Sequence, residues 1–211
     1  MIGHLLGDPD EFFARQSADP SYVAPALLVL LAGVAINANT VLVLPAFSRT
    51  LSGQSETIAR AVTLLGAVGG TLGVFGLWFI YAGTFHTLSV YFDGSGRFRT
   101  LFLLTGWGFA PLVLHGLLGA GAFQYALESA TVPADPQQLQ PFLDRLSRRS
   151  PLVVSSALRS VFLLWQALLW TFAVRHSRGL TVRQGLATVA LPVLVTLAVN
   201  VRDLLATLQV V

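Results

Sequence analysis

Long apolar stretches separated by short polar segments dominate the pattern along the chain. Five of these stretches are long enough for a helix to cross the roughly 30 Å hydrocarbon core of a bilayer, which takes about 20 residues. They cover about residues 22–47, 61–92, 101–126, 152–174 and 184–208. We therefore predict an all-α fold, an integral membrane helical bundle with five transmembrane helices, in a single domain over residues 1–211.

The second and third stretches are rich in glycine. The second is long for one upright helix, so we predict a single tilted or overhanging span. Its glycines fall four residues apart, Gly66 with Gly70 and Gly69 with Gly73, and each pair shares a helix face. Small residues let helices approach closely in lipid, so the pattern favours a packing seam. With Pro111 inside the third stretch, the alternative is a broken helix that lines a cavity.

Two shorter segments have the pattern of helices that lie in the membrane interface. Near the start, residues 8–11 resemble a capping box that opens a helix with Phe12 and Phe13. After Asp135, apolar residues recur at helical spacing over 139–146. For this second segment, the alternative is a surface helix that packs on the bundle. Between the first of these segments and the first span, Asp19 followed by Pro20 predicts a helix start.

Composition supports a chain that faces lipid and excludes several functions. Hydrophobic residues make up 54% and charged residues 11% of the chain, whereas soluble domains carry about 25% charged residues. The arginines are scattered and form no dense basic face, so we exclude nucleic-acid binding. Cysteine is absent, which removes thiolate catalysis and cysteine-type zinc sites.

Catalytic and metal-binding patterns are also missing. The two span histidines, His86 and His115, differ in predicted depth by around 12 Å, which is too far to share one ion. No nucleophile elbow of the G-x-S-x-G kind is present. We therefore expect no enzyme activity, no catalytic residues, no metal and no cofactor.

The distribution of arginines predicts the orientation. The N-terminal segment is acidic and is not a cleavable signal peptide. Six arginines fall on its side of the membrane and five on the other, and five of the six lie in the short loops 93–100 and 175–183. Since short loops weigh most in the positive-inside rule, we predict a multi-pass protein of the cell membrane with a cytoplasmic N-terminus.

The densest polar signal is the turn between the second and third spans. It comprises Asp93, Gly94, Ser95, Gly96, Arg97, Phe98 and Arg99. One hypothesis is a site for a phosphate or lipid headgroup, in which glycine amides and the two arginines bind the anion. The alternative is a tight hairpin turn whose arginines snorkel to lipid phosphates.

Several of these motifs, in this order, resemble the Yip-one superfamily of Ypt/Rab-interacting membrane proteins, in its prokaryotic branch. The resemblance rests on the segment from Asp8 to Phe13, on the glycine-rich span that ends near His86, and on the turn from Phe92 to Arg99. The run from Gly106 through Trp107 to Pro111 is similar to the small-aromatic-proline element of the family.

The resemblance implies a five-span bundle with a cytoplasmic N-terminus and supplies no catalytic residues. Eukaryotic members bind Rab-type GTPases through an N-terminal cytoplasmic region. Here that region has only about 20 residues, so GTPase binding is doubtful. The expected partners are membrane lipids and either another membrane protein or a second copy of the chain.

Two functions follow from these patterns. The first is a non-enzymatic membrane-organising or scaffold protein that works through lipid and helix contacts. The alternative is a small-solute or lipid transporter, in which Asn37, Asn39 and His86 would line one polar cavity. The positions of these three side chains discriminate between the two.

Overall fold

A computed structural model describes residues 2–45, 53–133 and 135–208, and every regular element in these ranges is helical. The elements are α1 (Ile2–Gly7), α2 (Pro9–Ala18), α3 (Val23–Leu42), α5 (Gln54–Val90), α6 (Phe98–Trp107), α7 (Ala110–Glu128), the short 3-10 helix η1 (Pro136–Gln138), α8 (Leu139–Ser147), α9 (Ser150–Arg178) and α10 (Val182–Thr207). Five helical segments are long and apolar enough to cross a membrane, with α6 and α7 together forming the third. The predicted all-α bundle is confirmed.

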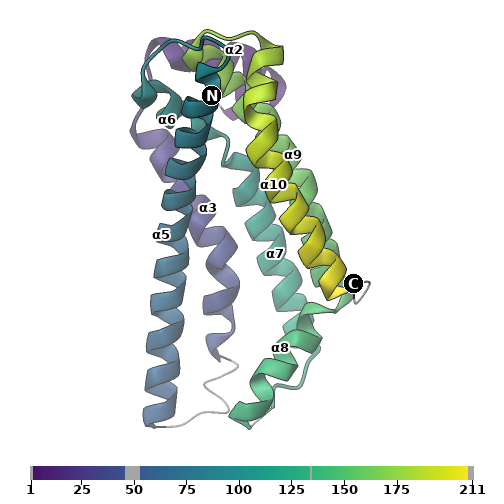
Figure 1. Cartoon of the computed structure of the whole chain (residues 1–211). Coiled ribbons are helices and arrows are strands. Elements are labelled where there is room, and N and C mark those ends of the chain that lie inside the picture. Colours follow the sequence, from purple (N-terminus) through teal and green to yellow (C-terminus); the bar gives the residue numbers. More distant parts are fainter. Residues whose placement is uncertain (1, 46–52, 134, 209–211) are drawn as a thin grey trace.

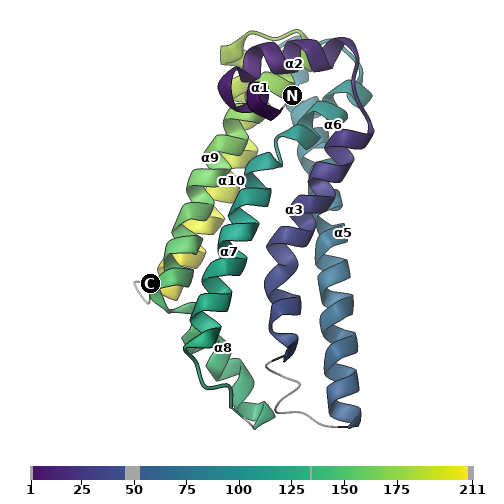
Figure 2. The same cartoon turned by 180° about the vertical axis from the view of Figure 1, so that it is seen from behind.

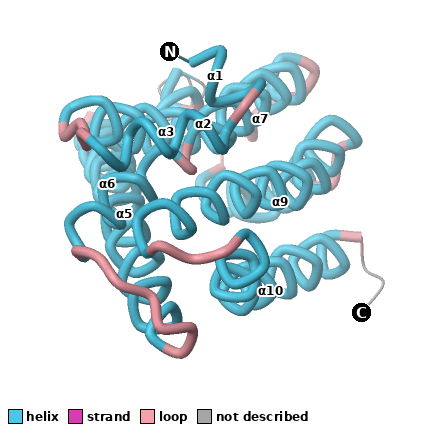
Figure 3. Tube along the Cα trace, turned by 90° about the horizontal axis from the view of Figure 1, so that it is seen from above, coloured by secondary structure: helices cyan, strands magenta, loops and turns pink. Residues whose placement is uncertain are grey.

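The long helices run side by side, with short helices across both ends (Figures 1 and 2). Helices α1 and α2 lie across one end, and α8 lies at the other. Viewed along the bundle, α9 lies beside α10, and α5 stands on the outside next to α6 (Figure 3). The α3–α5 and α9–α10 pairs are close near α2 and apart at the α8 end (Figure 1). Residues 2–18 thus form a cover over one end of the bundle.

The N-terminal cover begins as its sequence predicts, but the next helix does not. Asp8 caps α2, and its carboxylate accepts a hydrogen bond from the Glu11 backbone N–H at 3.1 Å. The expected helix start at Asp19 and Pro20 is wrong, because Asp19 is the C-cap of α2. The chain then turns into the bundle, and α3 starts only at Val23, without a side-chain cap.

The third span is broken just before Pro111. The amides of Gly108 and Phe109 bond three residues back, to the carbonyls of Thr105 and Gly106, as in a tight 3-10 turn. The indole N–H of Trp170 donates to the Thr105 carbonyl at 2.9 Å. Proline has no N–H to continue the ladder, so the break here follows from the sequence, and a tryptophan from α9 fills it.

The predicted glycine seam is correct for the third span and wrong for most of the second. A methyl group added to Gly108 would lie 2.2 Å from the Trp170 ring, and one added to Gly116 would lie 2.6 Å from the α3 backbone. On α5, only Gly70 is in such close contact, with Asn37. The other three glycines of the predicted α5 pairs, Gly66, Gly69 and Gly73, have open space at that position, and so does Gly76. No described atom of another helix comes within 4 Å of such a methyl group at these positions, so they form no close helix contact in the bundle.

Candidate functional site

The turn between α5 and α6 has a left-handed backbone at two positions and two backbone hydrogen bonds to the helices around it. Asp93 has a φ of 58° and Gly96 a φ of 111°, so the chain passes twice through the left-handed region. The Gly94 amide donates to the Ser89 carbonyl and the Ser95 amide donates to the Arg178 carbonyl, both at 2.9 Å. These two amides are therefore engaged inside the protein, which weakens the hypothesis of a phosphate site built on glycine amides.

Arg178, the last residue of α9, is the side chain that holds this turn. Only 4% of the residue is exposed. Its guanidinium donates to the Ser89 hydroxyl at 2.9 Å, to the Gly96 carbonyl at 2.5 Å and to the Gly94 carbonyl at 2.6 Å. No aspartate or glutamate in the described ranges forms an ion pair with Arg178. The buried guanidinium is thus stabilised by hydrogen bonds to three neutral oxygens. One belongs to Ser89 at the end of α5, and the other two belong to the turn.

Backbone contact explains why the turn needs glycine beside Arg178. A methyl group added to Gly96 would lie 2.4 Å from the Ser177 carbonyl oxygen. Gly179 ends α9 in the left-handed conformation, with a φ of 67°. The two hairpins at this end, residues 91–97 and 178–181, therefore lie backbone against backbone. We refer to these two hairpins together with α2 as the cap.

The two arginines predicted as headgroup ligands lie on the outside of the cap. Arg97 and Arg99 are exposed, and the Arg99 guanidinium lies 4.2 Å from the centre of the Tyr22 ring. Phe98 points inward, and its ring packs edge-on against the His86 imidazole at 5.4 Å. The structure thus brings His86 next to the turn, as an aromatic neighbour of Phe98.

A second ionic cluster fixes α2 to the bundle. Arg175 donates to both carboxylate oxygens of Asp10 at 2.5 Å, and the His176 ring contacts the same carboxylate. The pKa of Asp10 lies below its ordinary value, chiefly because of the His176 hydrogen bond; partial burial opposes this shift and Arg175 adds to it. Beside these charges, the Phe12 ring packs edge-on against Trp107 at 5.0 Å. Trp107 is therefore a core contact between α2 and α6.

Asn37 lies away from the cap, at the crossing of α3 and α5. Its side-chain amide donates to the Gly33 carbonyl one turn earlier at 2.8 Å. A methyl group added to Gly70 would lie 2.2 Å from the Asn37 carbonyl oxygen. Since Gly70 and His86 are 16 residues apart on α5, Asn37 and His86 are separated by about 24 Å along the helix axis. The structure does not bring these two residues into one cavity, and Pro111 lies at the break between α6 and α7.

Comparison with known proteins identifies the chain. The sequence model of the Yip1 domain matches residues 3–201, which is nearly the whole chain. The chain belongs to the Yip1 domain family. An uncharacterized protein of the archaeon Methanocaldococcus jannaschii is 26% identical over 114 residues, which cover 54% of this chain and 81% of that protein. No solved structure matches.

In this Yip1 domain, three of the four segments that carry the family resemblance lie at one end of the bundle, and the fourth, the glycine-rich span, runs along it as α5. The α2 segment, the turn from Asp93 to Arg99 and the run from Gly106 to Pro111 form the cap and the core beneath it. Sequence reasoning missed Arg178, which it counted only as a loop arginine. No local signal separates Arg178 from its neighbours Arg175 and Arg183, since all three flank the same hairpin.

Proposed function

We propose that this Yip1 domain is a non-enzymatic membrane-organising or scaffold protein that acts through lipids and neighbouring membrane helices. The observation that carries the proposal is the exposure of the half of α5 that lies farther from the cap. Buried residues on α5 occur only toward the cap, in one stripe: Val74, Trp78, Ala82, Phe85 and Ser89. None of the described side chains from 54 to 73 is buried. This half of a long helix offers a large apolar surface to whatever surrounds it.

The state of the cap supports the same proposal. Its buried charge, Arg178, is engaged by three oxygens, and Asp10 is engaged by Arg175 and His176. The charged side chains of the cap are thus used to hold its segments together, and we assign the interacting surface to the apolar helices.

Reconstitution of the purified protein into phosphatidylethanolamine–phosphatidylglycerol liposomes tests this function. We expect electron cryomicroscopy to show altered vesicle diameter or shape, and a polarity-sensitive probe to report altered lipid packing, in proportion to protein content. A single cysteine at Val62, an exposed residue in the same half of α5, should also capture a neighbour by crosslinking in native membranes. Unchanged shape and packing, together with no captured partner, would remove the basis of the proposal.

The orientation belongs to the same proposal and has its own test. The chain contains no cysteine, so single cysteines can be placed at Ser95 in the cap and at Gln140 in α8. Their reaction with a membrane-impermeant thiol reagent can then be measured separately from each side of the membrane. Both positions are exposed. We expect Ser95→Cys to be labelled only from the cytoplasm and Gln140→Cys only from outside. The reverse pattern would place the cap on the outer face.

Transport is the weaker candidate. It requires polar span residues to converge on one cavity, whereas Asn37 bonds to its own helix and His86 packs on Phe98 near the cap. The groove of about 630 Å³ between α3 and α5 is lined almost entirely by apolar side chains.

A further inference from the structure

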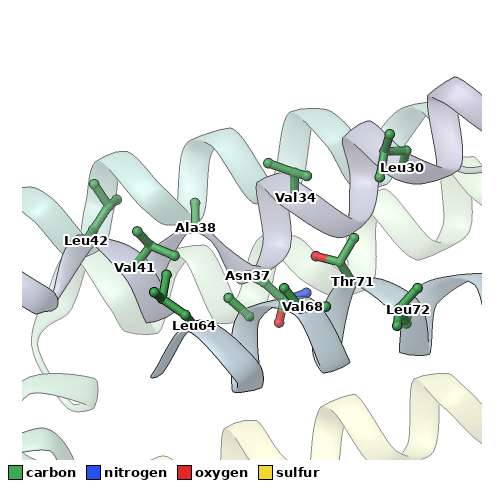
Figure 4. A pocket seen from close by; sticks show the side chains of 11 residues that line it. Leu30, Val34, Asn37, Ala38, Val41, Leu42, Leu64, Val68, Thr71 and Leu72 are labelled. Carbon is green, nitrogen blue, oxygen red and sulfur yellow. The ribbon is translucent and has the colours of Figure 1, made fainter. Parts of the chain in front are cut away.

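A long apolar groove runs between α3 and α5 in the half of the bundle farther from the cap (Figure 4). On the α3 side it extends from Leu30 past Val34 to Leu42, and on the α5 side from Leu64 to Leu72. Its volume is about 630 Å³. The one amide in the lining, Asn37, donates to its own helix. The wall that an occupant would meet is therefore almost entirely hydrocarbon.

The dimensions of the groove fit hydrocarbon chains and are too small for another helix. Leu30 and Leu42 are 12 residues apart, or about 18 Å, and Leu64 and Leu72 are 8 residues apart, or about 12 Å. Dividing 630 Å³ by these lengths gives a mean cross-section of about 35–53 Å². A helix with side chains is about 10–12 Å wide, or roughly 80–110 Å². A helix could rest only on the rims, whereas extended acyl chains can lie inside.

An arginine marks one end of the groove. A second hollow of about 510 Å³ is lined by Leu44, Pro45, Arg60 and Leu64, and it joins the groove at Leu64, which lines both. Arg60 and Leu64 are four residues apart and share a face of α5. Arg60 forms an ion pair with Glu56 at 2.6 Å, and its side chain is 56% exposed. The apolar groove therefore ends at a cation within about 10 Å of the start of α5, where a phosphate at the membrane surface would lie.

The open glycines of α5 belong to a different surface. At 100° per residue, Gly69 and Gly73 lie about 150° around the helix from the groove residues Leu64, Ala67 and Val68. A neighbouring helix that used the small residues would therefore leave the groove accessible to lipid.

We propose that the α3–α5 groove is a binding site for one phospholipid. An acyl chain of the lipid lies in the groove, and its phosphate lies at Arg60. The site deepens the proposed function and rests on it only in assuming that lipid surrounds these helices. Such a site retains one lipid molecule, unlike the annular lipids that surround any apolar transmembrane helix. Its ligand class is a diacyl phospholipid, for which phosphatidylglycerol is the probe.

The first experiment asks where a phospholipid chain lies. The protein is reconstituted with phosphatidylglycerol that carries a diazirine on one acyl chain, and after photolysis the adducts are mapped by peptide mass spectrometry. We expect adducts to concentrate on residues 30–42 and 64–72. Ala67→Phe should fill the groove and reduce these adducts to the level found on α10. Ala198→Phe is the matched control, since Ala198 is an exposed alanine on α10 outside the groove.

The second experiment asks what holds the headgroup, and it does not depend on the stability of the filled groove. Arg60→Gln should lower the phosphatidylglycerol adducts in the groove by about tenfold, the effect of losing one charge-assisted hydrogen bond. Arg60→Lys should retain them. Diacylglycerol with the same diazirine chain lacks the phosphate, so it should label wild type weakly and be insensitive to Arg60→Gln.

The outcomes separate this site from the proposed function. Adducts spread evenly over all lipid-facing helices, or unchanged in both Ala67→Phe and Arg60→Gln, would overturn the site, even if the protein still reshapes liposomes. Crosslinks from the groove to a second copy of the chain would also overturn it. Adducts that concentrate in the groove and respond to both variants would establish the site, even if vesicle shape and lipid packing stay unchanged.

Discussion

The hydrogen bonds of Arg178 lead to a prediction that tests the reasoning about the cap. Arg178→Met keeps a long apolar side chain and removes the guanidinium. Three hydrogen bonds are lost, to Ser89, Gly94 and Gly96, and a bond from a charged donor contributes about 1.5–3 kcal/mol. The burial cost of the guanidinium, several kcal/mol, is recovered in part. Water can also reach the Gly96 carbonyl, because Gly96 is exposed.

The balance is a loss of about 2–4 kcal/mol in the free energy of unfolding. We would measure it by titration with sodium dodecyl sulfate in mixed micelles, followed by circular dichroism. Hydrogen exchange of the peptide over residues 90–98 supplies a local readout, since the Ser95 amide donates to the Arg178 carbonyl, and exchange should accelerate. Arg178→Lys should recover only part of the loss, because an ammonium lacks the planar fork that reaches three acceptors.

The control is Arg183→Met, at an exposed arginine in the neighbouring first turn of α10. It should change the free energy of unfolding by less than about 0.5 kcal/mol. If Arg178→Met proved as neutral as Arg183→Met, and exchange over 90–98 were unchanged, the view of Arg178 as the side chain that holds the turn would be refuted.

Two further predictions concern close packing and pH. Gly108→Ala should destabilise the fold by about 1–3 kcal/mol because its methyl group would lie 2.2 Å from the Trp170 ring, whereas Gly73→Ala, with open space, should be neutral or stabilising in the same unfolding titration; equal effects would contradict the packing argument. The pKa of Asp10 is lowered in the folded protein, chiefly by the His176 hydrogen bond. The ionised Asp10 carboxylate therefore stabilises the fold above the ordinary pKa of about 3.9, and this stabilisation is lost as the pH falls through the pKa of the folded protein. Proteolysis of residues 9–18 should therefore accelerate below about pH 4 in wild type, and Asp10→Asn should show fast cleavage at every pH; a wild-type rate independent of acid would refute the role of this carboxylate.

Much of the fold was predictable because its signals are local. A span needs only sufficient length and hydropathy, and the backbone of a transmembrane helix satisfies its own hydrogen bonds. The N-cap of α2 by Asp8 and the break before Pro111 are also local, since each depends on residues within one helical turn. The start of α3 was mispredicted at Asp19 because a capping residue can end one helix as readily as it can begin the next.

The candidate site was predicted only in outline. The turn from Asp93 to Arg99 and its neighbour His86 do lie together, as the short sequence separation suggests. Trp107 lies under the cap, against Phe12, whereas Asn37 belongs to the α3–α5 crossing. The glycine pattern on α5 predicted a seam that the fold leaves open, because spacing along one helix does not tell whether another helix lies beside it.

Hydropathy, helix length and the order of short motifs can be read directly along the chain, so they were enough to assign the class of this protein. Which arginine is buried depends on the tertiary fold. Arg178 reaches Ser89, 89 residues away, while Arg97 and Arg183 stay exposed. The three are the same residue type in similar short loops, and their difference arises from which backbone carbonyls face each guanidinium once the hairpins meet. Burial of a charge depends on acceptors that surround it in space, and those acceptors are brought together by packing of distant segments.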